Sequence, residues 1–518
     1  MKYLIASPFC VCAISILITF FSLQKKKNAM EIVDDMGIGW NLGNSYECYS
    51  PTQELKDPIE QITLWGNIIP TKENVVQIKK YGFKTIRVPI TWMHFMDENG
   101  NVNSSWMSKV HEVVDWITKE KMYCIINVHH DCGKGNWLSE GMKSKDKYTN
   151  LWTQIANEFK DYDEYLIFES MNEIKFNEDE SYDYVTLYFF NQVFVDVVRN
   201  SGGKNGERLL IISGAKNDID LTYSSEYKLP IDPINKYAIS MSYYVPEQFS
   251  IEPDDNYWTY EDENGIHEIT SMKYWGNENQ YKDMFSNFET IKETYTDIGI
   301  PVIIIEAGVL TEQQKEPESI RRYLFTVFSM SASYNGIMTC LWDTSKKGAG
   351  NMNFYDKEHD VWYDEIIRNN FKQISEGKFV RPSKFSIQTN IETIFTPNPD
   401  GNMNIKIGKK SASKIMFSIK LNNEDIKNIS FIVESSDKVG NYIRNEISGS
   451  EGKKKYDGYY IFTADVSKRQ YYKYIEIKKP EGNDNVSFNY FRIEFVKNYT
   501  FFDYDSYINH IQNLKKNL

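Results

Sequence analysis

One repeated unit between residues 31 and 377 constrains the fold more than any other feature of this chain. The unit consists of a helical stretch, a turn that contains glycine, and a short apolar run. Helical residues 72–80, for example, end near Gly82 and lead into the apolar run 84–90. The apolar runs give eight strand candidates: 37–43, 84–90, 123–130, 165–173, 209–213, 237–244, 301–306 and 336–342.

The alternation of these runs with helices predicts the architecture. Near-continuous apolar strands between helices are typical of a parallel sheet that helices cover. Eight such units predict an α/β fold, a (β/α)₈ TIM barrel over residues 31–378. A doubly wound open sheet is the alternative fold. A glycine-rich phosphate loop does not follow the first strand, which argues against a nucleotide-binding version of that alternative.

The character of the sequence changes after Pro382. Short, partly alternating apolar segments are separated there by Asn, Gly, Asp and Lys, which predicts a smaller all-β sandwich over residues 381–500. Its Tyr- and Phe-rich runs suit either a sugar-binding surface or a sandwich core, so a carbohydrate-binding module and a structural spacer both stay open. Residues 501–518 form a tail in which we expect a short amphipathic helix, Tyr504–Leu518.

The first segment, residues 1–30, contains an apolar run at Tyr3–Leu23 that is followed by Lys25, Lys26 and Lys27. Such a run is typical of a signal peptide or an N-terminal membrane anchor. We therefore expect a secreted or cell-surface protein, anchored in the membrane if residues 3–23 are retained. The positive-inside rule, applied to the lysines alone, gives the opposite orientation for an anchored chain.

Composition excludes several partners. The net charge of −13 argues against a nucleic-acid partner, which would require a basic face. The six cysteines have no CxxC spacing, so we expect neither a metal cluster nor a disulfide framework, although one or two disulfides stay open for an extracellular chain. We expect a monomeric protein without a cofactor or a metal.

Polar side chains gather at the carboxyl ends of the predicted strands, where TIM barrels place their sites. Glu173 ends the fourth strand and Glu306 the seventh, on opposite sides of the barrel mouth. One acidic residue at a solvated strand end is usually a loop residue, but a pair is what glycoside hydrolysis requires. One carboxyl gives a proton to the leaving oxygen, and the other attacks the sugar or activates water. Further polar residues end other strands: Arg87, His129, His130, Asn172, Ser242, Tyr244, Trp342 and Asp343.

Eight motifs along residues 31–370 resemble, in order, the endo-β-1,4-glucanase group of glycoside hydrolase family 5. They are IGWNLGNS (38–45), WGNIIPT (65–71), GFKTIRVPITW (82–92), IINVHHD (125–131), LIFESMNE (166–173), SYYVPEQFS (242–250), GIPVIIIEAG (299–308) and LWDTSKKGAG (341–350). The resemblance implies retaining, endo-acting hydrolysis of β-1,4-glucosidic bonds in cellulose-like β-glucans, namely cellulose, mixed-linkage glucan or xyloglucan. It implies no metal.

The same resemblance assigns the chemical roles. Glu173 would be the general acid/base, and Glu306 would be the nucleophile that forms a glycosyl–enzyme intermediate. Asn172 would hydrogen-bond the sugar 2-hydroxyl. Arg87 and Tyr244 would keep Glu306 ionised, because donors to a charged carboxylate lower its pKa. Arg87 as part of a structural ion pair is the alternative. A retaining mechanism predicts carboxyl groups about 5–5.5 Å apart.

Further residues would hold the substrate. The resemblance implies that His129 hydrogen-bonds sugar hydroxyls, that Trp342 is a stacking floor, and that Asn44 and Trp65 line the groove. Barrel packing is the alternative role for Trp342. Because side chains alternate on a regular strand, only one of His129 and His130 would point inward, and the other would be a structural hydrogen-bonding residue.

Two positions depart from the family pattern. Ser242 stands where the family usually has His, and Ile305 stands where it usually has Gly before the nucleophile. These departures leave a second hypothesis open, a catalytically weakened barrel that binds β-glucan without cleaving it. The insert Glu247–Trp275, which carries Trp258, Tyr260, Tyr274 and Trp275, is predicted to wall the groove and to replace part of the missing His contacts.

Overall fold

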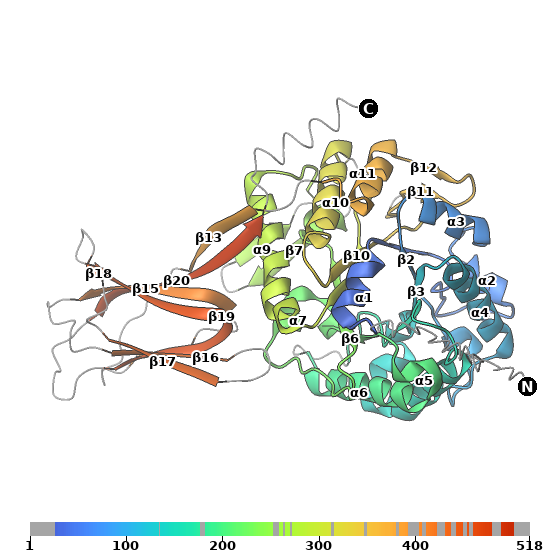
Figure 1. Cartoon of the computed structure of the whole chain (residues 1–518), viewed down its shortest axis with the longest axis horizontal. Coiled ribbons are helices and arrows are strands. Elements are labelled where there is room, and N and C mark those ends of the chain that lie inside the picture. The colour runs from blue at the N-terminus through green and yellow to red at the C-terminus, as the bar shows by residue number, and fades with distance from the viewer. Residues whose placement is uncertain are drawn as a thin grey trace, which may run out of the picture.

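Eight parallel strands close into a barrel in the order β1-β10-β9-β6-β5-β4-β3-β2 (Figure 1). The computed structural model describes residues 26–379 except 134, 177–181, 252–257, 263–264, 270–271, 312–314 and 347–349, and the strands of the C-terminal region. The barrel strands are β1 Gly39–Asn41, β2 Thr85–Val88, β3 Tyr123–Ile126, β4 Leu166–Glu169, β5 Leu210–Ser213, β6 Tyr237–Tyr243, β9 Val302–Ala307 and β10 Ile337–Leu341. Each lies within or overlaps a predicted run, so the TIM barrel is confirmed.

Helices surround the barrel. The longer ones are α1 Ala29–Met36, α3 Lys72–Lys80, α4 Ser104–Lys119, α5 Lys145–Glu158, α6 Tyr184–Asn200, α9 Glu278–Thr294, α10 Pro317–Ser331 and α11 Glu365–Ser375. The short ones are α2 Pro58–Ile62, α7 Ile219–Tyr223 and α8 Glu247–Ser250. Local sequence explains α3, in which Thr71 and Asn74 form a capping box and two lysines occupy the last turn.

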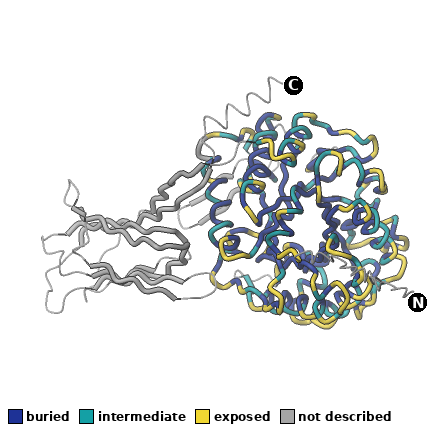
Figure 2. Tube along the Cα trace, viewed as in Figure 1, coloured by how far each residue is buried: buried dark blue, intermediate teal, exposed yellow. Residues whose placement is uncertain are grey.

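Helix α1 closes the barrel at the amino-terminal ends of its strands (Figure 1). The Thr85 hydroxyl at the start of β2 donates to the Met36 carbonyl, 2.8 Å away, and Asp34 accepts from the backbone N–H of Gly336, before β10. Apolar residues of α1 form one inner core with the inward-facing residues of the strands, including Ile303 and Ile305. A second, larger core lies between the sheet and the helices, and buried residues therefore trace the barrel in Figure 2.

Two small antiparallel ladders interrupt the barrel pattern. Strands β7 Trp258–Asp262 and β8 Gly265–Ile269 pair within the insert that follows β6. Strands β11 Tyr355–Asp356 and β12 Val361–Trp362 pair between β10 and α11. The second ladder carries Asp356 directly before Lys357, a buried residue whose contacts are described below.

The C-terminal region forms an antiparallel sheet in the order β13-β20-β15-β19-β16-β17, with β14 and β18 paired to β19. Its strands are β13 Ser383–Ile391, β14 Met403–Lys406, β15 Ser411–Leu421, β16 Ser430–Ser436, β17 Tyr442–Ser448, β18 Lys453–Lys454, β19 Tyr459–Lys478 and β20 Phe488–Phe501. A smaller all-β region after the barrel is thus confirmed. The predicted helix Tyr504–Leu518 lies outside the described residues.

The predicted apolar run Tyr3–Leu23 also lies outside the described residues. Among the helices that the structure describes, none combines the length and the apolar character needed to cross a membrane. Four of the six cysteines are described, and all four, Cys48, Cys124, Cys132 and Cys340, are buried and free. Within this described part of the chain, the disulfides that the sequence left open are therefore absent.

Candidate active site

Arg87, at the end of β2, organises the barrel mouth from a fully buried position. Its Nε and Nη2 atoms donate to the two carboxylate oxygens of Glu169 at 2.7 and 2.8 Å, and Nη1 donates to Glu306 Oε1 at 3.0 Å. Burial opposes the charge, but the attraction of Glu169 and Glu306 outweighs it and raises the pKa of Arg87. Arg87 therefore makes both predicted contacts, a structural ion pair and a bond to the candidate nucleophile.

Glu306 lies at the end of β9, where a bulge changes the alternation of side chains. Ile304 pairs with Met241 and Thr339 on the flanking strands, but Glu306 pairs with Ser242 and Ala307 with Leu341, so Ile305 is the extra residue. A bulge re-aims the residues that follow it. Ile305 can thus stay in the inner core while Glu306, the next residue, reaches Arg87.

Two donors contact the Glu306 carboxylate. Arg87 contacts Oε1, and the Tyr244 hydroxyl donates to Oε2 at 3.1 Å. Burial and the charge of Glu173 raise the pKa of Glu306 above its ordinary value, and the bonds from Arg87 and Tyr244 offset part of that rise. The influence of Glu173 on this pKa shows that the two carboxyl groups are electrostatically coupled, as a pair that shares one proton must be.

Glu173 follows β4 in a left-handed backbone conformation with φ of 40°. A residue other than glycine in this region costs of order 1–3 kcal/mol and marks a position that the surrounding structure fixes. The Ser242 hydroxyl donates to Glu173 Oε1 at 2.8 Å. Burial raises the pKa of Glu173, and the bond from Ser242 lowers it. Ser242, which stands where the family usually has His, thus contacts the candidate acid/base directly.

Asn172 and Asn41 are held by the same guanidinium. Asn172 Oδ1 accepts from Arg87 Nη2 at 2.7 Å, and Asn41 Oδ1 accepts from Nη1 at 3.0 Å. Asn41 also donates to the backbone carbonyls of Ile305 and Leu341, at 2.8 and 3.1 Å, and so joins β1, β9 and β10. The sequence interpretation included Asn172 but missed Asn41.

Glu169 and Asn127 were also missed, although Glu169 has a signal in the sequence. It is an acidic residue inside the apolar run LIFES, where a buried carboxylate requires a cation. Asn127 Nδ2 lies 3.2 Å from both Glu169 Oε1 and His129 Nδ1, while Asn127 Oδ1 accepts from the Ile90 N–H at 3.0 Å. Because the amide orientation is fixed, His129 Nδ1 is the acceptor and the proton lies on Nε2.

The two adjacent histidines do not follow strand alternation, because β3 ends at Ile126. Burial, His130 and Arg87 lower the pKa of His129 well below its ordinary value, so its ring is neutral. The His129 ring stacks on the Trp342 ring, with an interplanar angle of 4° and ring centroids 6.0 Å apart. The His130 ring lies 4.5 Å from that of His129, so both histidines belong to one aromatic group at the mouth.

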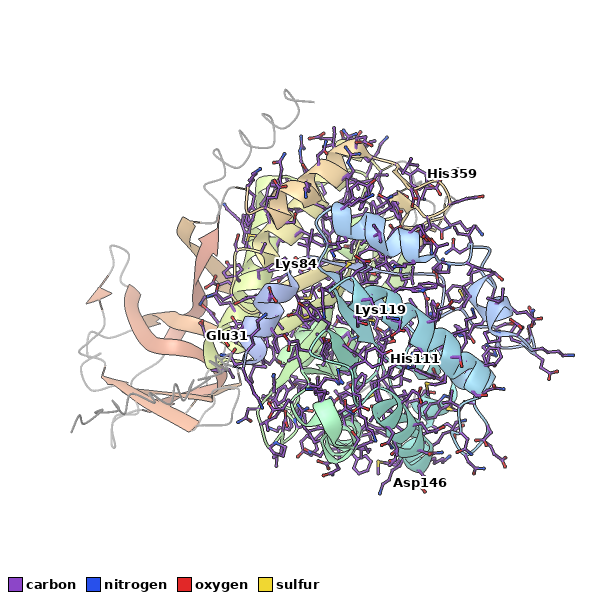
Figure 3. All side chains as sticks on the ribbon, turned by 45° about the vertical axis from the view of Figure 1, so that its right-hand side comes forward. Glu31, Lys84, His111, Lys119, Asp146 and His359 are labelled. Atoms are coloured by element: carbon purple, nitrogen blue, oxygen red, sulfur yellow. The ribbon has the colours of Figure 1, made fainter. Side chains whose placement is uncertain are left out.

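His130 connects this group to Trp65. Its ring centroid lies 4.9 Å from Tyr49 and 5.5 Å from Trp65, and Trp65 Nε1 donates to the Tyr49 carbonyl at 3.1 Å. Tyr49 is a further member that the sequence interpretation missed. By contrast, His111, on α4, and His359, between β11 and β12, lie on the outer surface of the barrel (Figure 3).

The insert after β6 includes one aromatic residue that departs from the predicted role. Trp275 is buried and packs against Tyr281 and Tyr323, with centroids at 4.8 and 5.3 Å, so it is a core residue and not a wall of the groove. Tyr274 is exposed. The side chains of Trp258 and Tyr260 lie outside the described residues.

A parallel eight-stranded barrel with two electrostatically coupled glutamates at its mouth, and with aromatic rings beside them, defines the class of the protein as a glycoside hydrolase. Residues 49–348 match the family model described as cellulase (glycosyl hydrolase family 5). The chain belongs to glycosyl hydrolase family 5.

Individual relatives agree with this assignment. The chain is 30% identical over 379 residues to endoglucanase A of Paenibacillus barcinonensis, covering 68% of this chain and 91% of the relative. It is 31% identical over 333 residues to endoglucanase A of Clostridium longisporum, covering 62% of this chain and 60% of the relative's length.

Solved structures agree as well. A GH5-4 broad specificity endoglucanase from an uncultured bovine rumen ciliate is 56% identical, with a TM-score of 0.66 over 69% of this chain and 99% of the other. A family 5 lichenase variant from Caldicellulosiruptor sp. F32, in complex with cellotetraose, is 28% identical, with a TM-score of 0.61 over 67% and 96%.

Proposed function

We propose that this protein hydrolyses internal β-1,4-glucosidic bonds of β-glucans with retention of configuration, with Glu306 as nucleophile and Glu173 as acid/base. The observation that carries the assignment is the unequal surroundings of the two carboxyls. Glu306 contacts a guanidinium and a phenol, whereas Glu173 contacts one serine hydroxyl. Positive charge beside a carboxylate favours its ionised form, so the shared proton resides on Glu173.

This distribution of one proton fits the two steps of a double displacement. Glu306 attacks the anomeric carbon, the glycosidic bond breaks, and Glu173 gives its proton to the departing oxygen. Glu173, now ionised, then takes a proton from water, and the water oxygen attacks the anomeric carbon and displaces Glu306. Asn172, fixed by Arg87, is placed to hold the sugar beside Glu173.

Two observations support the proposed substrate class: the activities of the relatives and the aromatic residues at the barrel mouth. The relatives named above include endoglucanases and a lichenase variant whose structure contains cellotetraose. The aromatic group of Trp342, His129, His130, Trp65 and Tyr49 supplies flat faces for sugar rings. We therefore propose cellulose, mixed-linkage glucan and xyloglucan as substrates.

The roles of the two glutamates are tested by varying the leaving group. Glu306→Ala should abolish cleavage of both barley β-glucan and an activated aryl β-cellobioside. Glu173→Ala should lose activity on the polymer but retain the glycosylation step with the aryl substrate, which needs no protonation, and azide should accelerate its turnover. Glu158→Gln, an exposed change on α5, is the control. The opposite pattern would exchange the two roles.

A barrel that binds β-glucan without cleaving it is the second candidate function, because Ser242 and Ile305 depart from the family pattern. The contact between Ser242 and Glu173 favours the active enzyme. If wild type releases no reducing ends from β-glucan, xyloglucan or carboxymethyl cellulose, but is retarded by them in an affinity gel, the binding protein is the better description.

The C-terminal all-β region is proposed as a carbohydrate-binding module that holds the enzyme on its polymer. An attached module raises the local concentration of substrate without any new contact in the active site. Deletion of residues 381–518 should lower pull-down on insoluble cellulose while leaving hydrolysis of cellotetraose unchanged. Unchanged pull-down would support a structural spacer instead.

We also propose a secreted or cell-surface location, because the polymeric substrates lie outside cells and the run Tyr3–Leu23 is typical of a signal or anchor. Protease added to intact cells should remove the β-glucanase activity but not a cytoplasmic marker enzyme. Protection of both activities would place the barrel inside the cell.

A further inference from the structure

Two buried carboxylates lie beneath the groove wall and take no part in the proposed chemistry. Glu47 accepts from the backbone N–H groups of Asn44 and Ser45, the latter at 2.9 Å. Asp343 accepts from Trp40 Nε1 at 2.9 Å and from three backbone N–H groups, those of Ser345, Phe354 and Tyr355. Neither side chain reaches solvent, so each carboxylate acts on the protein groups that surround it.

These two segments carry predicted substrate contacts. Glu47 fixes the backbone at Asn44, which has a left-handed φ of 53°. Asp343 directly follows Trp342, the predicted stacking floor. The segments also touch, because a Cβ atom on Gly43 would lie 2.6 Å from the Asp343 carbonyl oxygen and 3.6 Å from the Trp342 ring. Asn67 Nδ2 bridges them, donating to the carbonyls of Asn44 and Thr344 at 2.8 Å each.

Lys357 brings a buried cation to the same place from the turn after β11. It is 3% exposed, and its Nζ donates to the Gly43 carbonyl at 3.2 Å and to the Ser45 hydroxyl at 3.1 Å, on both sides of Asn44. Burial lowers the pKa of Lys357 to about 8, and the charges of Asp343 and Glu47 oppose this shift by favouring the protonated form. Burying a lysine this deeply lowers the stability of the fold unless its charge is compensated and its N–H donors are hydrogen-bonded. Here that compensation requires both the segment around Asn44 and the segment around Asp343 to be in place.

We propose that Lys357 is a positioning residue. It fixes the loop at residues 43–45 (the Asn44 loop) against the loop at residues 342–345 (the Trp342 loop), and so sets the width of the substrate groove. The inference rests on the proposed function for its statement about substrate, since Trp342 is assigned there to the sugar-binding group and Asn44 is predicted from the sequence to line the same groove. Lys357 itself touches no substrate. Its loss therefore acts on how tightly the glucan is held more than on the chemistry at Glu173 and Glu306.

The first test is Lys357→Met, which keeps much of the side-chain volume but removes the charge and both hydrogen bonds. We expect KM for cellotetraose to rise about tenfold, as for a misplacement of binding groups, with a smaller change in kcat. Lys357→Arg, which retains the charge, should restore part of the lost affinity.

A matched control separates positioning from stability. Arg199 forms a comparable, largely buried pair with Asp232, 2.8 Å apart, near the start of the β6 strand and away from the mouth. Arg199→Met should lower the Tm but leave KM unchanged per folded molecule. If Lys357→Met also changes only the Tm, Lys357 is structural and the proposal is wrong.

A double variant covers the case in which Lys357→Met folds poorly. Glu47→Gln/Lys357→Met removes one charge of each sign, so it should regain part of the Tm. Because Glu47 also holds the Asn44 backbone, the reference is Glu47→Gln alone, and KM should be higher in the double variant because the bonds to Gly43 and Ser45 are missing. Recovery of a wild-type KM in this folded variant would overturn the proposal.

Binding measured without turnover distinguishes this inference from the proposed function. In a Glu306→Gln background, calorimetric titration with cellotetraose should show about tenfold weaker binding when Lys357→Met is added. That result supports the positioning role even if wild type proves unable to cleave glucan. Equal affinity with and without Lys357→Met contradicts it, whatever the activity of wild type.

Discussion

The two carboxyl groups of the site are held in different ways. Glu306 belongs to a strand, is re-aimed by a bulge, and accepts from Arg87 and Tyr244. Glu173 lies beyond the end of its strand in a left-handed conformation, and its carboxylate accepts a hydrogen bond from the Ser242 hydroxyl. A nucleophile must stay ionised in one place, while an acid/base must gain and lose a proton. The unequal supports match these tasks.

Removal of Arg87 should produce the largest effect, because it takes the cation from Glu306 and from Glu169 together. Arg87→Met leaves buried Glu169 uncompensated, which costs about 3–5 kcal/mol of unfolding free energy, and kcat should fall by several orders of magnitude. Denaturant unfolding and kinetics on β-glucan measure the two losses. Adding Glu169→Gln should recover stability but not kcat. Recovery of both stability and kcat would show that Arg87 serves only as the ion-pair partner of Glu169.

Tyr244→Phe sharpens the comparison on the side of the nucleophile. Loss of one donor to a charged group at an active site costs on the order of 10²-fold in kcat. The Tyr244 hydroxyl lowers the pKa of Glu306, so without it that pKa rises and the acidic limb of kcat/KM moves to higher pH. A profile that keeps its acidic limb would show that Tyr244 does not tune Glu306.

Ser242→Ala makes the corresponding change on the side of the acid/base. The Ser242 bond lowers the pKa of Glu173, so its loss raises that pKa and moves the basic limb of kcat/KM to higher pH. The net value of one such bond is about 0.5–1.5 kcal/mol, so kcat should fall by roughly tenfold or less. Because the two carboxyls titrate as a pair, the informative result is which limb moves. Equal shifts of the same limb in both variants would contradict separate roles.

Much of the barrel was predictable because its signals are local and repeat eight times. Helical stretches, glycine turns and apolar runs placed all eight strands, and the strand-end rule brought Glu173, Glu306, Arg87 and Tyr244 together. The insert was different, since nothing in its sequence distinguished Trp275 as a core residue from an exposed aromatic side chain.

The details that aim the side chains were not predictable. Alternation on regular strands failed for His129 and His130 because β3 ends at Ile126, and it would have turned Glu306 away without the bulge at Ile305. Both features depend on pairing with neighbouring strands, which a single strand sequence does not encode. The inner network of Asn41, Asn127 and Glu169 likewise forms only when distant strands meet.

Ile305→Val should have the smallest effect, because the side chain fills the inner core below the site and does not touch substrate. Removing one methylene there costs about 0.5–1.5 kcal/mol. Ile303→Val, two residues earlier in the same core, is the matched control. If Ile305 only fills space, the two variants lose similar unfolding free energy and keep wild-type pH profiles. If instead Ile305→Val alone lowers kcat, the branched side chain at the bulge helps to aim Glu306, and the difference between the supports of the two carboxyl groups extends into the core.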